Sequence, residues 1–283
     1  MFQVFFTFID VECLCGKFFS SKQLFSCVYL KSGVTGIIGP SSAESSLHVR
    51  SICDAKEMPM IETRIDSSSR HVINLHPHPD DLGRAYLELV HAAGWEGFTI
   101  LYQSAPWLPL VEFLLKNYRA DHTITVRQLD ITYNDNYRPQ LRRVKLSEDK
   151  NIVLCCSIDS LPEILKQAQQ VGLMTDQHKF LITTLDMHTI DLEPFQYSGT
   201  NITGLRLISP NDELVKTVTN FFTKTFDRKN QNKQDGDDDL ERGEYFERTA
   251  ESEGLTAEKI RVETALTYDA GKVEDSLKLN RFN

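Results

Sequence analysis

Long hydrophobic runs are the first feature that this sequence of 283 residues lacks. No apolar stretch reaches the roughly 20 residues that a transmembrane helix requires, so we expect no membrane span and no membrane contact by this segment. Residues 1–9 are apolar, but they lack a basic leading region and run into Asp10 and Glu12, which is not a convincing signal peptide. Basic residues are also in the minority, since 31 Lys and Arg stand against 40 Asp and Glu. The resulting formal charge of −9 argues against nucleic acid as a partner, because phosphate-backbone binding needs clustered basic residues.

Catalytic and cofactor motifs are missing as well. The cysteines stand at positions 13, 15, 27, 53, 155 and 156, and no two of them form the C-x-x-C pair of zinc and redox sites. No Gly-rich loop ends in Lys-Ser or Lys-Thr, so no nucleotide cofactor is expected. The stretch from Gly39 to Ala43 lacks the second glycine of a nucleophile elbow. We therefore predict that the chain is not an enzyme and that it holds no cofactor and no metal ion.

The sequence does contain a repeated alternation of short β-rich runs and amphipathic helical stretches from residue 34 onward. Leu82, Tyr86, Leu89 and Val90 are the inward positions expected of one such helix. The expected strands are 34–38, 60–61, 72–75, 98–102, 123–129, 152–155, 180–183 and 202–208, and the expected helices are 41–57, 80–93, 108–118, 138–146, 161–171 and 211–226. This alternation predicts an α/β protein whose mostly parallel sheets are flanked by helices.

The number of β–α units exceeds what one compact sheet needs, which predicts two lobes. Two prolines within residues 76–79 forbid regular structure there and suit a crossover between the lobes. A return crossing is expected near Ser209 and Pro210. The predicted domains are an atypical leader with a residual helix at 1–32, a discontinuous first lobe at 33–78 plus 209–283, and a second lobe at 79–208. Residues 227–254 are polar and almost free of aliphatic side chains, so we expect a mobile insertion within the first lobe.

Two short polar motifs are candidate sites. Ser41 and Ser42 follow Gly39-Pro40 at the start of a predicted helix, where hydroxyl and backbone N–H groups could contact an anion in a cleft. Capping of the helix alone explains these two serines equally well. Asn201-Ile202-Thr203 is an N-glycosylation acceptor and gives modest support to a secreted protein.

The stretch 33–42, which reads Gly-Val-Thr-Gly-Ile-Ile-Gly-Pro-Ser-Ser, resembles the amino-terminal domain of kainate-type ionotropic glutamate receptors. The resemblance continues in the same order over some 240 residues, through 48–55, 58–64, 74–79, 94–102, 165–173, 199–204 and 263–270. Such ordered landmarks make an accidental match implausible.

This resemblance implies a fold like that of bacterial leucine/isoleucine/valine-binding proteins, a periplasmic-binding-protein type I clamshell of the receptor ligand-binding-region type. It implies an extracellular segment of a ligand-gated cation channel subunit in synaptic glutamate signalling, on the postsynaptic plasma membrane. The implied role is subunit pairing and assembly with other glutamate-receptor subunits through dimerisation, while glutamate binds a separate domain.

The match also has departures at both ends. The family's first strand and first helix should precede Cys27, where this chain carries a leader of another kind, and the chain stops soon after residue 270. We therefore expect the domain to be incomplete at both ends. By the same resemblance, Cys27 takes the place of a first-lobe cysteine whose disulfide partner lies beyond residue 270, and no cysteine follows Cys156 here.

For pairing, we expect the helix that begins near Ala43 and the helix 108–118 to contribute. Leu47 and Ile52 would lie on an exposed flank of the first helix if Val49 and Cys53 face the sheet, although Leu47 and Ile52 could equally be core residues.

Other protein classes share the sequence features that predict this fold. A stand-alone small-molecule binder of the periplasmic type shares all of them, and a hydrolase or transferase of doubly wound fold shares most.

Overall fold

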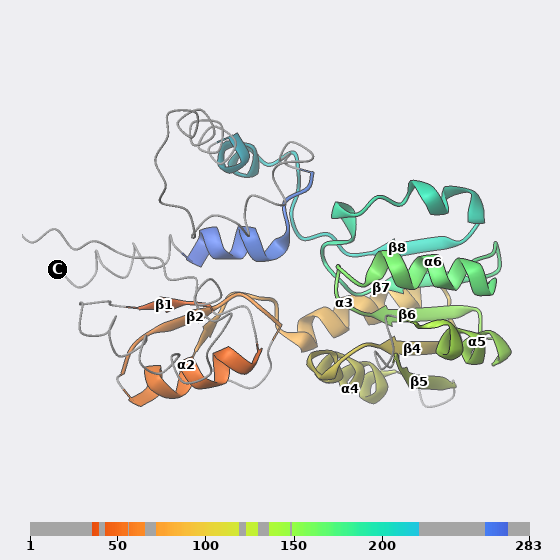
Figure 1. The fold of residues 1–283 in the computed structure, drawn as a ribbon, viewed down its shortest axis with the longest axis horizontal. Coiled ribbons are helices and arrows are strands. Elements are labelled where there is room, and N and C mark those ends of the chain that lie inside the picture. Colours follow the sequence, from red (N-terminus) through yellow and green to blue (C-terminus); the bar gives the residue numbers. More distant parts are fainter. Residues whose placement is uncertain are drawn as a thin grey trace, which may run out of the picture. The chain divides into compact units, whose positions relative to one another are not determined.

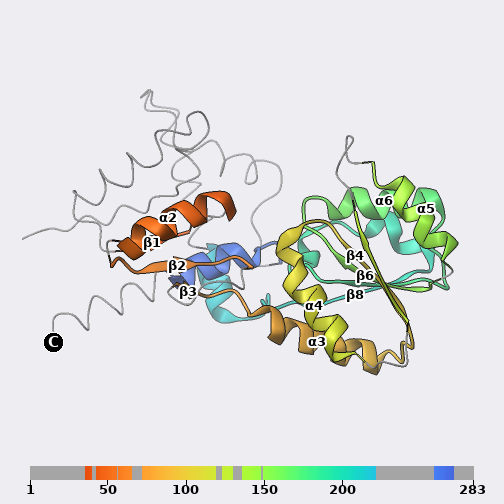
Figure 2. The same ribbon diagram turned by 90° about the horizontal axis from the view of Figure 1, so that it is seen from below.

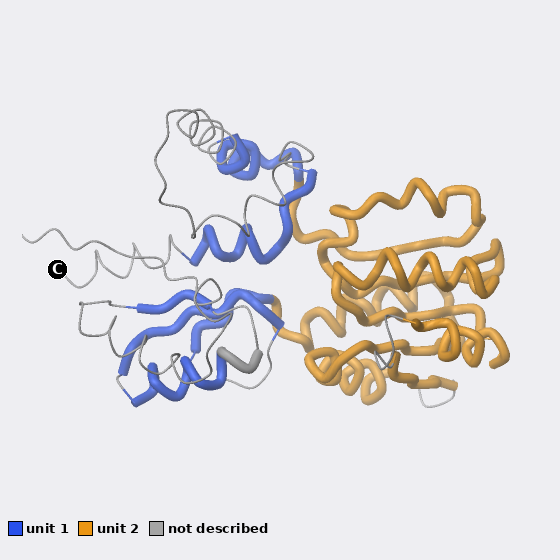
Figure 3. The backbone as a smooth tube through the Cα atoms, in the orientation of Figure 1, with its two compact units in different colours: residues 1–76, 210–283 blue, residues 77–209 orange. Residues whose placement is uncertain are grey.

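The computed structural model describes residues 36–39, 43–55, 57–65, 72–118, 123–129, 136–147, 149–220 and 258–270. Contacts between Cα atoms divide the chain into two compact units, one of Met1–His76 with Pro210–Asn283 and one of Pro77–Ser209 (Figure 3). The predicted leader, the predicted insertion at 227–254, and the residues Cys27, Ser41 and Ser42 lie outside the described residues.

The first unit contains a small parallel sheet. Its strands β1 (Ile37–Ile38), β2 (Met60–Glu62) and β3 (Ile73–Asn74) are ordered β1-β2-β3. Helix α2 (Ala43–Ala55) connects β1 to β2, and its Val49 and Cys53 side chains pack with Met60 of β2 in a buried cluster. Residues 213–220 and 262–270 are also helical and belong to this unit.

The second unit is built on a five-stranded sheet in which every neighbouring pair is parallel (Figure 1). The strands are β4 (Phe98–Tyr102), β5 (Ile124–Gln128), β6 (Asn151–Cys155), β7 (Lys179–Ile182) and β8 (Asn201–Gly204), in the order β5-β4-β6-β7-β8. The chain therefore first extends the sheet from β4 to β5 and then crosses back to β6. This reversal places a topological switch point between β4 and β6.

Helices cover both faces of this sheet, as Figure 2 shows. α3 (Pro79–Ala92) and α4 (Leu108–Asn117) pack together on one face, and α5 (Arg138–Leu146) and α6 (Leu161–Val171) on the other. Short 3-10 segments η1 (Ala105–Trp107), η2 (Met187–Thr189) and η3 (Glu193–Ser198) lie in the connections. The predicted α/β fold, with parallel sheets flanked by helices, is confirmed.

Burial on both faces of the sheet explains why the central strands of the second unit are continuous apolar runs in the sequence. Alternate side chains of a strand point to opposite faces, and a sheet covered on both sides must bury both sets. In β6, Ile152 and Leu154 join the cluster that includes Leu141 of α5 and Ile164 of α6. Val153, which points the other way, is also completely buried.

Helix ends follow from local residue chemistry. At the start of α3, the His78 ring accepts a hydrogen bond from the Asp80 backbone N–H, and Pro79 occupies the first turn. Gly94 follows α3 with φ of 65°, and Gly172 ends α6 with φ of 77°. Glycine adopts this left-handed backbone without the steric penalty of a Cβ atom, so α6 stops where the sequence predicts and α3 stops one residue earlier.

Close packing of α3 against α4 depends on Gly83. A Cβ atom at this position would lie 2.3 Å from Cδ1 of Phe113 on α4, far inside van der Waals contact. Phe113 would have to move, and with it the contact between the two helices.

We expect Gly83→Ala to lower the free energy of unfolding by about 1–3 kcal/mol because of this overpacking. The same change in an open helix would raise stability by about 1 kcal/mol. Urea unfolding followed by circular dichroism measures the difference. A variant as stable as the unsubstituted chain would show that α3 and α4 do not approach this closely.

Some expectations for individual elements were wrong in detail. Leu87 is buried where Leu89 was expected, and Leu89 is only half-buried. The reason is that α4 covers the flank of α3 that carries Gly83 and, one turn later, Leu87. The last strand ends at Gly204 instead of continuing to residue 208, and the 3-10 segments were not predicted.

Candidate functional site

The outward face of α4 is the first candidate site. Leu110, Val111 and Leu114 are buried on its inner side. Leu108 and Leu115 stand seven residues apart, which places them on one face of the helix, and each side chain is 44% exposed. Two large apolar side chains aligned on an outer helix face are a feature of protein-binding surfaces.

Strand β5 lies at an end of the sheet, where it hydrogen-bonds with β4. Its residues Ile124 to Arg127 are half-buried, and Gln128 is exposed. An edge strand retains backbone N–H and C=O groups that another chain can pair with. Helix α4 contacts β4, the strand with which β5 pairs.

Helix α2 of the first unit has a comparable exposed leucine. Val49 and Cys53 pack against the sheet, and Leu47 is 63% exposed. Ile52 is half-buried. The geometry leaves Leu47 accessible to another protein, and the pairing role of Leu47 and Ile52 stays a prediction.

A buried ion pair fixes α2 to its sheet. Arg50 Nη2 lies 3.0 Å from Glu62 Oε1 and 2.9 Å from Glu62 Oε2, and the Glu62 side chain is completely buried. The Ser46 hydroxyl, which is also buried, donates to Glu62 Oε1. Sequence reasoning missed this group, because charged residues on a helix are usually solvated.

A polar cluster occupies the carboxyl edge of the second sheet at its switch point. Gln103 directly follows β4 and is 8% exposed. Its Oε1 accepts a hydrogen bond of 2.9 Å from the Ser157 backbone N–H, and its Nε2 donates one of 2.8 Å to Ser160 Oγ. Ser160 precedes α6, and small ligands bind α/β sheets at such points. The signal in the sequence is a polar residue directly after an apolar strand, and the sequence alone does not show where the strand order reverses.

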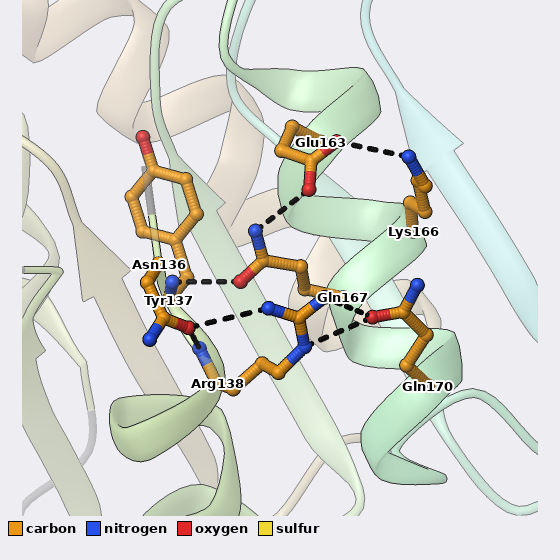
Figure 4. Close-up of polar contacts among 7 residues, drawn as sticks. All are labelled: Asn136, Tyr137, Arg138, Glu163, Lys166, Gln167 and Gln170. Atoms are coloured by element: carbon orange, nitrogen blue, oxygen red, sulfur yellow. Dashed lines mark hydrogen bonds and ion pairs between the residues drawn. The ribbon is translucent and has the colours of Figure 1, made fainter. Parts of the chain in front are cut away.

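Helices α5 and α6 are joined by side-chain amides (Figure 4). The Tyr137 backbone N–H donates to Gln167 Oε1 at 2.7 Å, and Gln167 Nε2 donates to Glu163 Oε1 at 2.7 Å. This hydrogen bond from Gln167 is the main reason that the pKa of Glu163 is lowered. Arg138 Nε and Nη2 donate to Gln170 Oε1 at 2.9 and 2.5 Å. The network holds the start of α5 against the side of α6.

Cys53, Cys155 and Cys156 are free and buried, which confirms that these thiols pack as small apolar groups. Burial raises the pKa of the Cys155 thiol to about 12. The pKa of the Cys156 thiol is also raised. Burial is the larger cause, and the neighbouring Cys155 is the smaller one. Neither thiol is suited to nucleophilic or redox chemistry, which needs an exposed thiolate.

We expect Cys155 in the folded chain to react with iodoacetamide at pH 8 about a thousandfold more slowly than in the urea-unfolded chain. The raised pKa keeps the thiol protonated at this pH, and burial blocks access. Mass spectrometry with fragmentation of the peptide that contains both Cys155 and Cys156 follows Cys155 separately. Equal rates in both states would contradict the buried position.

Two kinds of feature are absent from the part of the chain that the structure describes. In this part of the chain, no three or more His, Cys, Asp and Glu side chains are grouped as metal ligands. Its helices include none with the combined length and hydrophobicity of a membrane span.

The glycosylation acceptor lies on an exposed edge. Asn201 begins β8, the strand at the other end of the five-stranded sheet, and its side chain is exposed. The Thr203 hydroxyl donates to Asn201 Oδ1 at 3.0 Å. The acceptor is therefore accessible, and its modification stays a prediction.

Comparisons with known proteins all match this chain to receptors. The family model described as "Receptor family ligand binding region" matches residues 16–271. The chain is 35% identical over 199 residues to "Glutamate receptor ionotropic, kainate 1" of Homo sapiens, and equally to the protein of that name from Macaca fascicularis. Each match covers 68% of this chain but only 22% of the relative.

Proposed function

Because this chain belongs to the receptor family ligand binding region, in the form that occurs in kainate-type ionotropic glutamate receptors, we propose that it is a subunit-pairing module of such a receptor. It is not an enzyme, since this family consists of receptors. The proposed location is the extracellular, postsynaptic face of the plasma membrane, and the proposed partners are other glutamate-receptor subunits. In this proposal the chain neither binds glutamate nor gates the channel.

The observation that carries the proposal is the aligned, exposed pair Leu108 and Leu115 on α4, in the unit whose sheet has β5 as an edge strand. A two-fold dimer uses the same patch on both subunits, so a self-complementary apolar helix face suits it well. The exposed Leu47 on α2 provides a second contact of the same chemistry in the proposed first lobe, residues 33–78 plus 209–283. The proposed second lobe is residues 79–208.

The double variant Leu108→Asp/Leu115→Asp tests this pairing. We expect it to weaken self-association at least tenfold, because a charge would have to be buried against an apolar partner surface. The Leu47→Asp variant should act in the same direction. Sedimentation velocity over a range of concentrations gives the dissociation constants.

The matched control is Leu146→Asp, because Leu146 is 81% exposed and ends α5, the helix on the opposite face of the sheet. Its association should equal that of the unsubstituted chain. If the α4 variant also associates like the unsubstituted chain, α4 is not part of the pairing surface.

Small-molecule binding is the second candidate function, and the Gln103 cluster favours it. Its amide and hydroxyl groups lie where ligands of parallel α/β sheets bind. Calorimetric titration with L-glutamate and with branched-chain amino acids distinguishes the two functions. Saturable heat that disappears in Gln103→Ala would support the binder, while its absence together with concentration-dependent dimerisation would support the pairing module.

A further inference from the structure

Helix α5 carries a concentration of positive charge that the pairing function does not use. Its nine residues include Arg138, Arg142, Arg143 and Lys145 and no acidic residue, although the whole chain has a net charge of −9. The buried Leu141 and Val144 side chains fix the helix to the sheet. The basic side chains must therefore point away from the core.

The exposure of these side chains bears this out. Arg142, Arg143 and Lys145 are exposed, and Arg138 is half-buried. Arg138, Arg142 and Lys145 follow the i, i+4, i+7 spacing of one helix stripe, which extends over about 10 Å. We call Arg138, Arg142, Arg143 and Lys145 the α5 basic face.

Contacts with α6 hold both ends of this stripe in place. Arg138 donates two hydrogen bonds to Gln170, as Figure 4 shows. Lys145 Nζ donates to the Val171 carbonyl oxygen at 2.9 Å, at the carboxyl end of α6. Two of the four cations of the α5 basic face, Arg138 and Lys145, are therefore already held in position. Binding of an anion here costs less side-chain entropy than binding to a row of freely moving lysines.

Positive charge extends beyond the helix. The exposed Lys150 directly precedes β6, and the exposed Lys179 is the first residue of the neighbouring strand β7. The pKa of His178 is lowered chiefly by burial and then by the charges of Lys145 and Lys150, while Asp176 acts in the opposite direction. The positive charges of Lys145 and Lys150 therefore lie near the same residue, His178.

The carboxylates that the structure describes on the two helices and in the adjoining turn, Glu163 and Asp149, are already engaged. Glu163 accepts from Gln167 and lies 3.5 Å from Lys166 Nζ. Asp149 accepts hydrogen bonds from Ser147 and Thr99. Among the described residues, neither of these carboxylates pairs with Arg142 or Arg143, so both guanidinium groups are available to an anion.

We propose that the α5 basic face binds a sulfated glycosaminoglycan of the heparan sulfate type. Short runs rich in Lys and Arg are typical of heparin-binding patches, and the planar guanidinium group pairs with oxyanions through two N–H donors. A linear and open row of cations suits an extended polyanion better than a single small anion, which binds in a concave site. The choice of a glycan as the polyanion rests on the extracellular location in the proposed function.

Calorimetric titration of the full chain with a heparin dodecasaccharide at about 0.15 M NaCl tests this proposal. We expect the unsubstituted chain to bind and Arg142→Gln/Arg143→Gln to lose about tenfold or more in affinity, with a smaller dependence on salt concentration, because fewer counterions are released. The thermal unfolding midpoint of the variant should be unchanged, since both side chains are exposed.

The matched control is Arg84→Gln/Lys116→Gln, which removes the same two charges from α3 and α4, where both residues pair with acidic neighbours. This control should bind heparin like the unsubstituted chain. An equal loss in both double variants would mean that net charge alone decides binding, and this would overturn the proposal.

Binding of two further ligands distinguishes a sulfated glycan from other polyanions. Hyaluronan, which carries carboxylates but no sulfates, should bind much more weakly than the heparin fragment. A poly-glutamate peptide that binds as tightly as heparin would instead assign the face to an acidic protein segment. These titrations need only the isolated chain, so their outcome does not depend on whether α4 mediates subunit pairing.

Discussion

Arg50→Met is expected to lower the free energy of unfolding by about 3–5 kcal/mol, because it leaves the carboxylate of Glu62 buried without its cation. Glu62 is completely inaccessible to solvent and receives hydrogen bonds from Arg50 and from the Ser46 hydroxyl. The hydroxyl alone is a poor replacement for a guanidinium group that donates to both carboxylate oxygens. Urea unfolding followed by circular dichroism measures the loss.

The double variant Arg50→Met/Glu62→Leu is the control for this first prediction. Replacement of both partners of a buried ion pair by apolar residues of similar size is often neutral or stabilising. The double variant should therefore be more stable than Arg50→Met alone. If it is equally unstable or less stable, the loss comes from packing around Arg50 and not from the unpaired carboxylate.

Phe98→Ala is the second change with a large expected effect, a loss of about 3–5 kcal/mol. The Phe98 ring is completely buried, and its centroid lies 4.9 Å from that of Tyr118 in an edge-to-face arrangement and 6.2 Å from that of Trp95. The Tyr118 hydroxyl donates to the Trp95 carbonyl oxygen at 2.6 Å. Removal of the ring leaves a cavity between two aromatic groups that are themselves linked by this hydrogen bond.

Tryptophan fluorescence during urea unfolding follows this cluster directly, because Trp95 is part of it. Leu146→Ala serves as the comparison, since Leu146 is 81% exposed and its truncation should change stability by no more than about 0.5 kcal/mol. A Phe98→Ala variant that is no less stable than Leu146→Ala would place Phe98 outside the core.

The alternation of strands and helices could be predicted because it is a local property of the sequence. The runs 98–102 and 152–155 are apolar at every position or nearly so, which is the signature of strands covered on both faces. Gly94 and Gly172 marked helix ends for a local steric reason. The helical segments α5 and α6 were predicted with the bounds that the structure has.

Features that depend on packing between distant segments could not be read from the sequence. Burial of Leu87 depends on where α4 lies against α3, and the Arg50–Glu62 pair depends on the register of α2 over β2. The segments η2 and η3 are too short and irregular to produce a hydrophobic period. For the candidate sites, Leu47 and the helix of Leu108 were selected from the sequence, while the Gln103 cluster needed the strand order.

The two surfaces of the second unit have different chemistry. The face of α4 exposes leucines, whereas the opposite face of the sheet carries the α5 basic face. Apolar contact favours a protein partner, and a row of arginines favours a polyanion. If both proposals hold, pairing and glycan binding use opposite faces of the same sheet.

Disulfide trapping of a Leu115→Cys variant tests the central claim most directly, because a residue close to a two-fold axis contacts its own copy in the partner subunit. After mild oxidation, non-reducing electrophoresis should show much more covalent dimer than either the unsubstituted chain or a Leu146→Cys variant forms. If Leu115→Cys forms no more dimer than Leu146→Cys, the α4 face does not pair subunits.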